Sequence, residues 1–137
     1  MLDSYFIAAG AAILLALGLV HLLWVFGGRK FEPRDAALKQ RMQEVTLVIT
    51  REATMWSTWV GFNASHAFGA IFFGLVYAYL PLTHPRMFFG SPFLIGAGLA
   101  LLAGYVALGR YFWSTVPFRG IVAATALYVL GLVVHFA

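Results

Sequence analysis

Four long stretches of the chain contain no Asp, Glu, Lys or Arg, and each is long enough for a helix that crosses a bilayer. A hydrocarbon core about 30 Å thick needs roughly 20 apolar helical residues. The pattern therefore predicts an all-α integral membrane protein, a four-transmembrane-helix bundle that forms a single membrane domain over residues 1–137. The predicted spans cover about residues 4–27, 53–80, 91–111 and 119–136. Pro81 is expected to end the second span and Pro92 to begin the third.

The apolar stretches are continuous and do not alternate between apolar and polar residues, which excludes a transmembrane β-barrel. Hydrophobic residues make up 62% of the chain and charged residues 10%, whereas about a quarter of a soluble domain is charged. This composition excludes a soluble globule and a nucleic-acid-binding domain. The chain has no cysteine, so disulfides, thiolate metal sites and cysteine nucleophiles are excluded as well.

The segment between the first two spans is the only long polar one. We expect an amphipathic helix over about residues 33–52 on the cytoplasmic side, because four apolar residues recur at helical spacing: Leu38, Met42, Val45 and Ile49. This helix either lies flat with its basic residues toward anionic headgroups, or continues the second span as one long helix. It serves as a solvated connector or as a docking arm for a partner.

The basic residues predict the orientation of the spans. Six Lys and Arg residues lie in the segment 29–52, two lie between the third and fourth spans, and the connection between the second and third spans has only Arg86. Basic loops stay in the cytoplasm. We therefore expect a multi-pass protein of a bacterial-type inner (cytoplasmic) membrane, with both termini on the non-cytoplasmic side.

Small residues on the third span predict close helix packing. Gly96, Ala100 and Gly104 are spaced four residues apart on one helical face, and small residues let helices approach closely in lipid. They either seal the bundle or contact another subunit or a second copy of the chain.

Polar side chains within the spans gather on the second span. His66 lies near its middle, with Asn63 and Trp59 on the same face and Ser65 on the adjacent one. An imidazole can ligate haem or hydrogen-bond a quinone or pigment carbonyl. The candidate cofactor-binding residues are His66, Asn63, Ser65, Trp59, Tyr77 and, on the first span, His21.

The expected depths of the histidines argue against haem between two of them. His21 and His66 differ by about 9 Å in estimated depth, at 1.5 Å per helical residue, and two axial ligands need nearly equal depth. A metal site is disfavoured as well, because no carboxylate lies inside the spans to join the histidines.

No catalytic motif is present: the G-x-S-x-G elbow, the H-E-x-x-H zinc motif and the P-loop are all missing. The sequence therefore favours a non-catalytic accessory or structural subunit of a larger membrane complex (respiratory, photosynthetic or transport), or a homo-oligomer. The expected partners are membrane lipid and other membrane subunits or further copies of the chain. The alternative is a binder of a hydrophobic cofactor or lipid (haem, quinone, pigment or sterol) around His66. A small oligomeric channel or exporter is a third hypothesis, although the spans lack a charged constriction.

Overall fold

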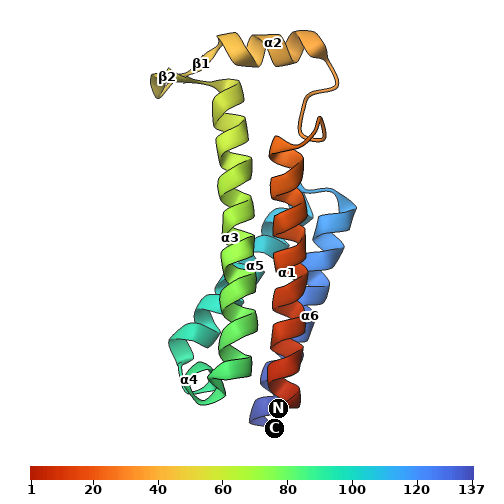
Figure 1. Cartoon of the computed structure of the whole chain (residues 1–137), viewed down its shortest axis with the longest axis vertical. Coiled ribbons are helices and arrows are strands. Elements are labelled where there is room, and N and C mark those ends of the chain that lie inside the picture. Colours follow the sequence, from red (N-terminus) through yellow and green to blue (C-terminus); the bar gives the residue numbers. More distant parts are fainter. The chain divides into compact units, whose positions relative to one another are not determined.

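The computed structural model describes all residues from 1 to 137 and is almost entirely helical (Figure 1). Its elements, in chain order, are α1 (Leu2–Phe26), α2 (Ala36–Glu44), β1 (Thr46–Leu47), β2 (Thr50–Thr54), α3 (Met55–Thr83), α4 (Pro85–Phe89), α5 (Pro92–Phe112) and α6 (Thr115–Phe136). Four of these helices, α1, α3, α5 and α6, are long and apolar enough to cross a membrane. Each contains most of one of the four stretches without charge, and the charged residues Asp3, Arg110 and Arg119 lie in terminal turns of these helices.

The ends of the long helices follow from local chemistry. Ser91 caps α5 by accepting a hydrogen bond from the backbone N–H of Leu94, and Pro92 occupies the first turn as predicted. Pro81 does not end α3, which continues to Thr83. A proline this close to a helix end removes a single hydrogen bond from the last turn, so the expected end near Leu80 is wrong by three residues.

Only the first part of the helix expected over residues 33–52 is present in the structure. Asp35 caps α2 by accepting a hydrogen bond from the N–H of Ala37, but the helix ends at Glu44 because the backbone of Val45 is extended. Residues 46–54 form an antiparallel β-hairpin instead. The segment after Glu44 is rich in β-branched residues, which favour strands over helices.

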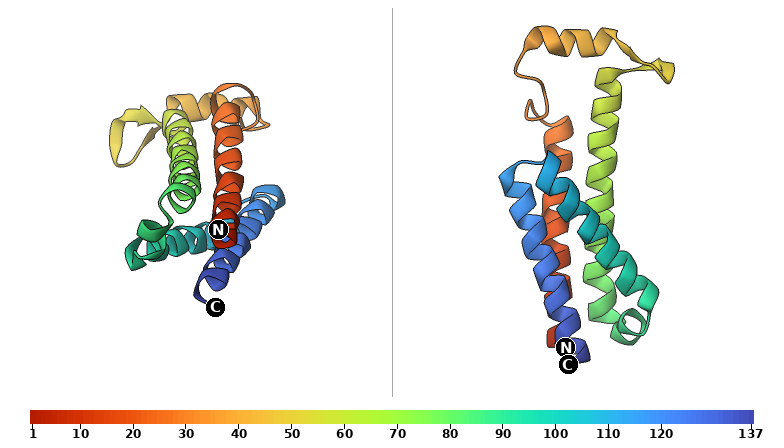
Figure 2. Two further views of the ribbon diagram at one scale, coloured as in Figure 1. Left: turned by 60° about the horizontal axis from the view of Figure 1, so that its bottom comes forward. Right: turned by 180° about the vertical axis from the view of Figure 1, so that it is seen from behind.

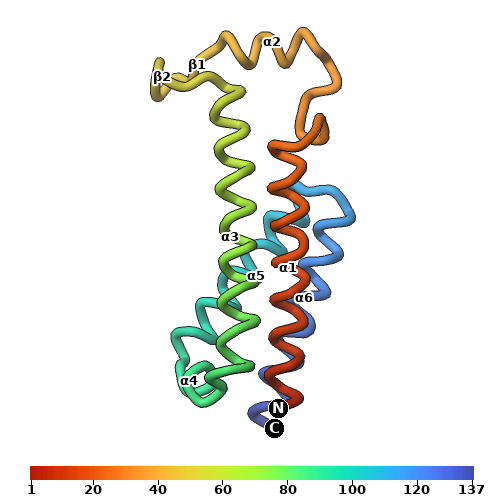
Figure 3. The backbone as a smooth tube through the Cα atoms, in the orientation of Figure 1, coloured from red at the N-terminus to blue at the C-terminus, as the bar shows by residue number.

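The hairpin overturns two expectations about this segment. Leu38 and Met42 lie on α2, whereas Val45 follows its last residue and Ile49 lies in the hairpin turn, so the four do not share one helical face. The hairpin also separates α2 from α3, which excludes one continuous helix. The backbone trace shows α2 running across the axis of α3 near the start of that helix (Figure 3).

The chain divides into two compact units, one made of residues 18–69 and the other of residues 1–17 and 70–137. The second contains the main hydrophobic core. Within it α5 and α6 are joined by a short turn at residues 113–114 and pack against each other (Figure 2).

Two tyrosines organise this core. The hydroxyl of Tyr77 donates to the carbonyl of Leu94 at 2.8 Å, and the hydroxyl of Tyr128 donates to the carbonyl of Ile95 at 3.2 Å. Both rings lie against Gly98, where an added Cβ would come within 2.6 Å of Tyr77 Cε1. Glycine is thus required at this position for the two rings to reach α5.

Candidate functional site

A chain of hydrogen bonds joins the end of α1 to α3 within residues 18–69. The side-chain N–H of Asn63 donates to the carbonyl of Trp59 at 2.8 Å. This bond orients the amide, so that its Oδ1 faces the Nε2 of His21 at 3.2 Å. Since an amide oxygen only accepts, Nε2 of His21 carries the proton and donates it. Asn63 therefore holds the ring of His21 in one orientation and one tautomer.

His66 joins the same cluster. Its ring lies 5.3 Å from the ring of His21, centroid to centroid, at an interplanar angle of 67°. The ring of Phe31 lies 4.4 Å from that of His21. Two histidines and an amide therefore meet beside an aromatic ring from the connecting loop.

The closeness of the two histidines corrects the depth estimate made from sequence. That estimate placed His66 at the middle of the second span, but α3 has 29 residues and its middle lies about one turn further on, near Gly69. His66 is thereby displaced toward the same end of the helices as His21.

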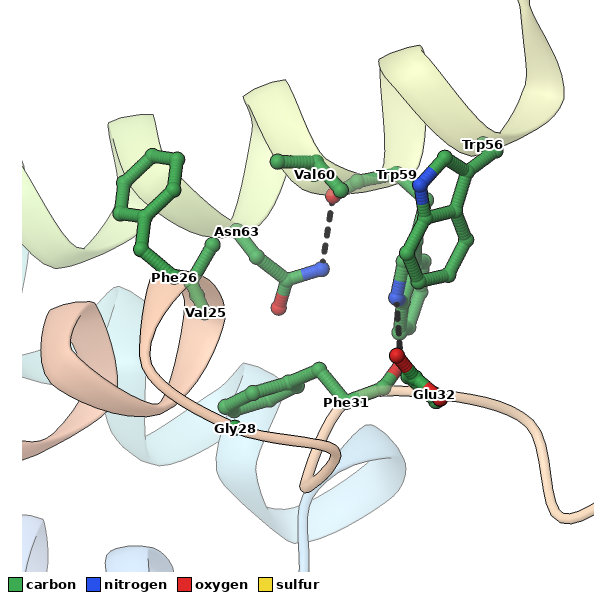
Figure 4. Close-up of a pocket in the computed structure, with 9 residues that line it drawn as sticks. All are labelled: Val25, Phe26, Gly28, Phe31, Glu32, Trp56, Trp59, Val60 and Asn63. Carbon is green, nitrogen blue, oxygen red and sulfur yellow. Dashed lines mark hydrogen bonds between the residues drawn. The ribbon is translucent and has the colours of Figure 1, made fainter. Parts of the chain in front are cut away.

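A cavity of about 160 Å³ adjoins this cluster. Figure 4 shows the amide of Asn63 pointing into it, with the ring of Phe31 opposite and the indole of Trp56 at one side. The lining is completed by the indole of Trp59, apolar side chains and one carboxylate; its residues are Val25, Phe26, Gly28, Phe31, Glu32, Trp56, Trp59, Val60 and Asn63. Most of the residues that line the cavity are thus aromatic or apolar, and Asn63 and Glu32 supply its polar side chains.

The loop that closes the cavity is tied to α3. The indole N–H of Trp59 donates to the carbonyl of Phe31 at 2.9 Å. This bond joins residues 28 apart in sequence and fixes Phe31 over the cavity. Trp59, placed by sequence on the His66 face, is therefore a wall of the cavity and an anchor for the loop.

Ion pairs fasten the same loop to α2. Glu32 accepts from Lys39 at 2.6 Å and from Arg29 at 3.0 Å. Both cations lower the pKa of the Glu32 carboxyl below its ordinary value, and the hydrogen bond from Lys39 has the larger effect. Lys39 also lies 5.0 Å from the ring of Trp56, a cation–π distance. The mouth of the cavity is thus bordered by a small charged network.

Two of the six candidate residues lie outside the cluster. Ser65 is exposed and donates to the carbonyl of Phe62 in its own helix. Tyr77 lies eleven residues beyond His66 on α3 and is bound to Leu94 in the core of the other unit. The structure brings together the other four candidates, which are His21, Asn63, His66 and Trp59.

Sequence reasoning missed Phe31, Glu32 and Lys39. A signal was available, because Phe31 is a large aromatic residue in an otherwise polar and basic loop that follows Gly27 and Gly28. Its partner on α3 could not be foreseen, since the contact depends on how the loop folds back.

The side chains of the site and the volume of the cavity indicate what kind of ligand the site can hold. No group of three His, Cys, Asp or Glu side chains lies close enough together to bind a metal ion. An engineered apolar cavity of about 150 Å³ accommodates benzene, whereas pockets for larger ligands and cofactors measure about 300–1,000 Å³. The cavity therefore suits one six-membered ring and is too small for a haem.

The fold and the site define an all-helical protein with four helices long enough to span a bilayer and an aromatic cavity beside a histidine pair. No protein-family model, curated protein or solved structure matches this chain.

Proposed function

We propose that this chain is a multi-pass membrane protein. The four long helices have 25, 29, 21 and 22 residues, and only 22% to 33% of the residues in the most apolar part of each are buried. Large apolar side chains such as Phe62, Phe72 and Phe93 are at least 70% exposed. Water-soluble monomers rarely expose apolar surface on this scale, so a lipid environment accounts for the composition.

The proposed orientation places the loop and hairpin between α1 and α3 in the cytoplasm. Six Lys and Arg residues in this segment support that side, by the tendency of basic loops to remain cytoplasmic. With four spans, both termini then lie on the non-cytoplasmic side of a bacterial-type inner membrane.

Within this protein the proposed activity is the binding of a small, single-ring lipophilic molecule of the quinone class. The observation that carries the proposal is the aromatic cavity of about 160 Å³ with the Asn63 amide pointing into it. An aromatic ring would stack between Trp56 or Trp59 and Phe31. An amide nitrogen has two N–H groups, and Asn63 uses one on the carbonyl of Trp59. The second can donate to a ligand carbonyl.

The experiment is a binding titration of the purified, reconstituted protein with a short-chain quinone, followed by quenching of tryptophan fluorescence. We expect saturable quenching for the unmodified chain. Asn63→Leu should weaken binding about 10-fold, since one hydrogen bond to a buried polar group is lost. Ser65→Ala is the matched control, because Ser65 lies on the same helix but outside the cavity. Quenching that does not saturate, or that is equal in both variants, contradicts the proposal.

The accessory-subunit hypothesis is a second candidate, supported by a different observation. Gly96, Ala100 and Gly104 are exposed, and a Cβ added at Gly96 or Gly104 would meet nothing within 4 Å. These residues therefore do not seal the packing of α5 in this structure. A flat, small-residue face of this kind suits close contact with another transmembrane helix.

A further inference from the structure

The tip of the β-hairpin carries two apolar side chains with no protein contact to bury them. Leu47 pairs with Thr50 in the antiparallel register, so Val48 and Ile49 form a two-residue turn. Val48 is fully exposed and Ile49 is 90% exposed. The strands that support this turn are mainly polar, with three threonines and the exposed Arg51 and Glu52.

Turn chemistry does not explain these residue types. Two-residue hairpin turns favour Asn-Gly and similar pairs, because the preferred turns need residues with positive φ. No residue of this chain has positive φ, and two β-branched residues are poor formers of such turns. The apolar side chains at the tip therefore point to a role outside the hairpin itself.

The hairpin is attached where a membrane helix meets the headgroups. α3 has 29 residues, about 43 Å at 1.5 Å per residue, which matches a bilayer of about 40–45 Å with its headgroups included. The hairpin leads directly into Met55, the first residue of α3, and its base is closed by the hydrogen bond from Met55 N–H to the carbonyl of Val45 at 2.8 Å. In Figure 1 the hairpin projects sideways from the start of α3.

We propose that Val48 and Ile49 insert into the lipid interface of the membrane that α3 crosses, with Arg51 facing the anionic headgroups. This inference rests on the membrane insertion proposed above. Lipid fits the tip better than a protein partner does, since two side chains offer far less area than the roughly 800 Å² per partner of a stable protein interface. A bilayer needs no such complementary area, because apolar side chains partition into it individually.

The test uses the absence of native cysteine. Val48→Cys provides a single site for an environment-sensitive fluorophore, and Glu52→Cys, exposed on the polar strand of the same hairpin, is the matched control. Both are reconstituted into vesicles of phosphatidylcholine and phosphatidylglycerol. We expect the Val48→Cys label to show blue-shifted emission, quenching by spin-labelled lipid and loss of quenching by aqueous iodide. The Glu52→Cys label should be quenched by iodide.

A third variant separates failure of this inference from failure of membrane insertion. Phe68→Cys places the label near the middle of α3, at a position that is 59% exposed. If lipid quenches the Phe68→Cys label while iodide quenches both hairpin labels equally, the anchoring proposal is overturned and membrane insertion stands. If iodide reaches position 68, the membrane proposal itself fails. Shielding of position 48 in native membranes but not in pure lipid vesicles would indicate a protein partner and would also overturn the proposal.

Discussion

The ring of His21 on α1 lies 5.3 Å from the ring of His66 on α3, centroid to centroid. Asn63 Oδ1 accepts a hydrogen bond from Nε2 of His21. Asn63 lies one turn before His66 on α3, so a single helix face supplies both contacts. The histidine pair is therefore held by one amide that is itself oriented by the carbonyl of Trp59.

Replacing Asn63 should loosen the pairing of α1 with α3. Asn63→Leu removes the bonds to His21 and to Trp59, and interhelical hydrogen bonds within membranes contribute about 0.6–2 kcal/mol. We expect a loss of about 1 kcal/mol in the free energy of unfolding, measured by denaturant titration in detergent micelles. Ser65→Ala should change it little, because its hydroxyl bonds only within α3. Equal stability of Asn63→Leu and the unmodified chain would show that the amide does not hold the helices.

Trp59→Phe should release the loop over the cavity. Phenylalanine keeps an aromatic wall but cannot donate to the carbonyl of Phe31. We expect faster hydrogen exchange over residues 28–34, measured by mass spectrometry, with α5 unchanged. Trp24→Phe is the control, since Lys30 lies over the ring of Trp24 and a phenyl ring retains this contact. Unaltered exchange in the Trp59 variant would mean that the ion pairs alone hold the loop.

Lowering the pH should also release the loop of residues 28–34. The pKa of Glu32 is depressed in the folded chain by Lys39 and Arg29. Its ion pairs therefore stabilise the loop fully above the unfolded-state pKa of about 4.3, and this contribution is lost as the pH falls through the lower folded-state pKa. We expect exchange over residues 28–34, corrected for its intrinsic pH dependence, to rise below about pH 4.3. Glu32→Gln should abolish that dependence; a pH response that persists in the variant would assign it to another group.

Two glycines of α5 should respond in opposite ways to alanine. At Gly98 an added Cβ would clash with the hydroxyl of Tyr128 and the ring of Tyr77, so Gly98→Ala should destabilise the chain by about 1–3 kcal/mol. At Gly96 the Cβ meets nothing, and the higher helix propensity of alanine should leave stability unchanged or raise it by up to about 1 kcal/mol. Thermal unfolding in one detergent compares the two. Equal destabilisation by both would place Gly96 in a contact as well.

The exposed small-residue face of α5 predicts a self-association surface. Ala100→Leu adds bulk where the chain has open surface, so folding should be preserved while close helix approach is blocked. We expect analytical ultracentrifugation in detergent to show an oligomer for the unmodified chain and a monomer for the variant. A control at another exposed position, Val133→Leu on α6, should keep the oligomer. An oligomer that survives Ala100→Leu would exclude this face.

Much of the fold follows from sequence because the determining interactions are local. Long runs without charge predict helices of membrane-spanning length. Pro92 correctly indicates the start of α5, because the fixed φ of proline suits the first turn of a helix. Periodicity also places Trp59, Asn63 and His66 on one face, since that needs only 3.6 residues per turn. Periodicity wrongly predicted a helix over residues 45–54. The apolar residues there recur at helical spacing, but the segment is rich in β-branched residues and forms a hairpin.

What sequence alone determined here is therefore the number, approximate position and apolar character of the long helices, together with the polar face of α3, because hydropathy and helical geometry act within a segment. Tertiary structure decided which residues form the site. The meeting of His21 with His66 and the position of Phe31 over the cavity depend on how residues 27–54 fold back against α3. Such contacts join positions tens of residues apart, and no local rule specifies the distance between them.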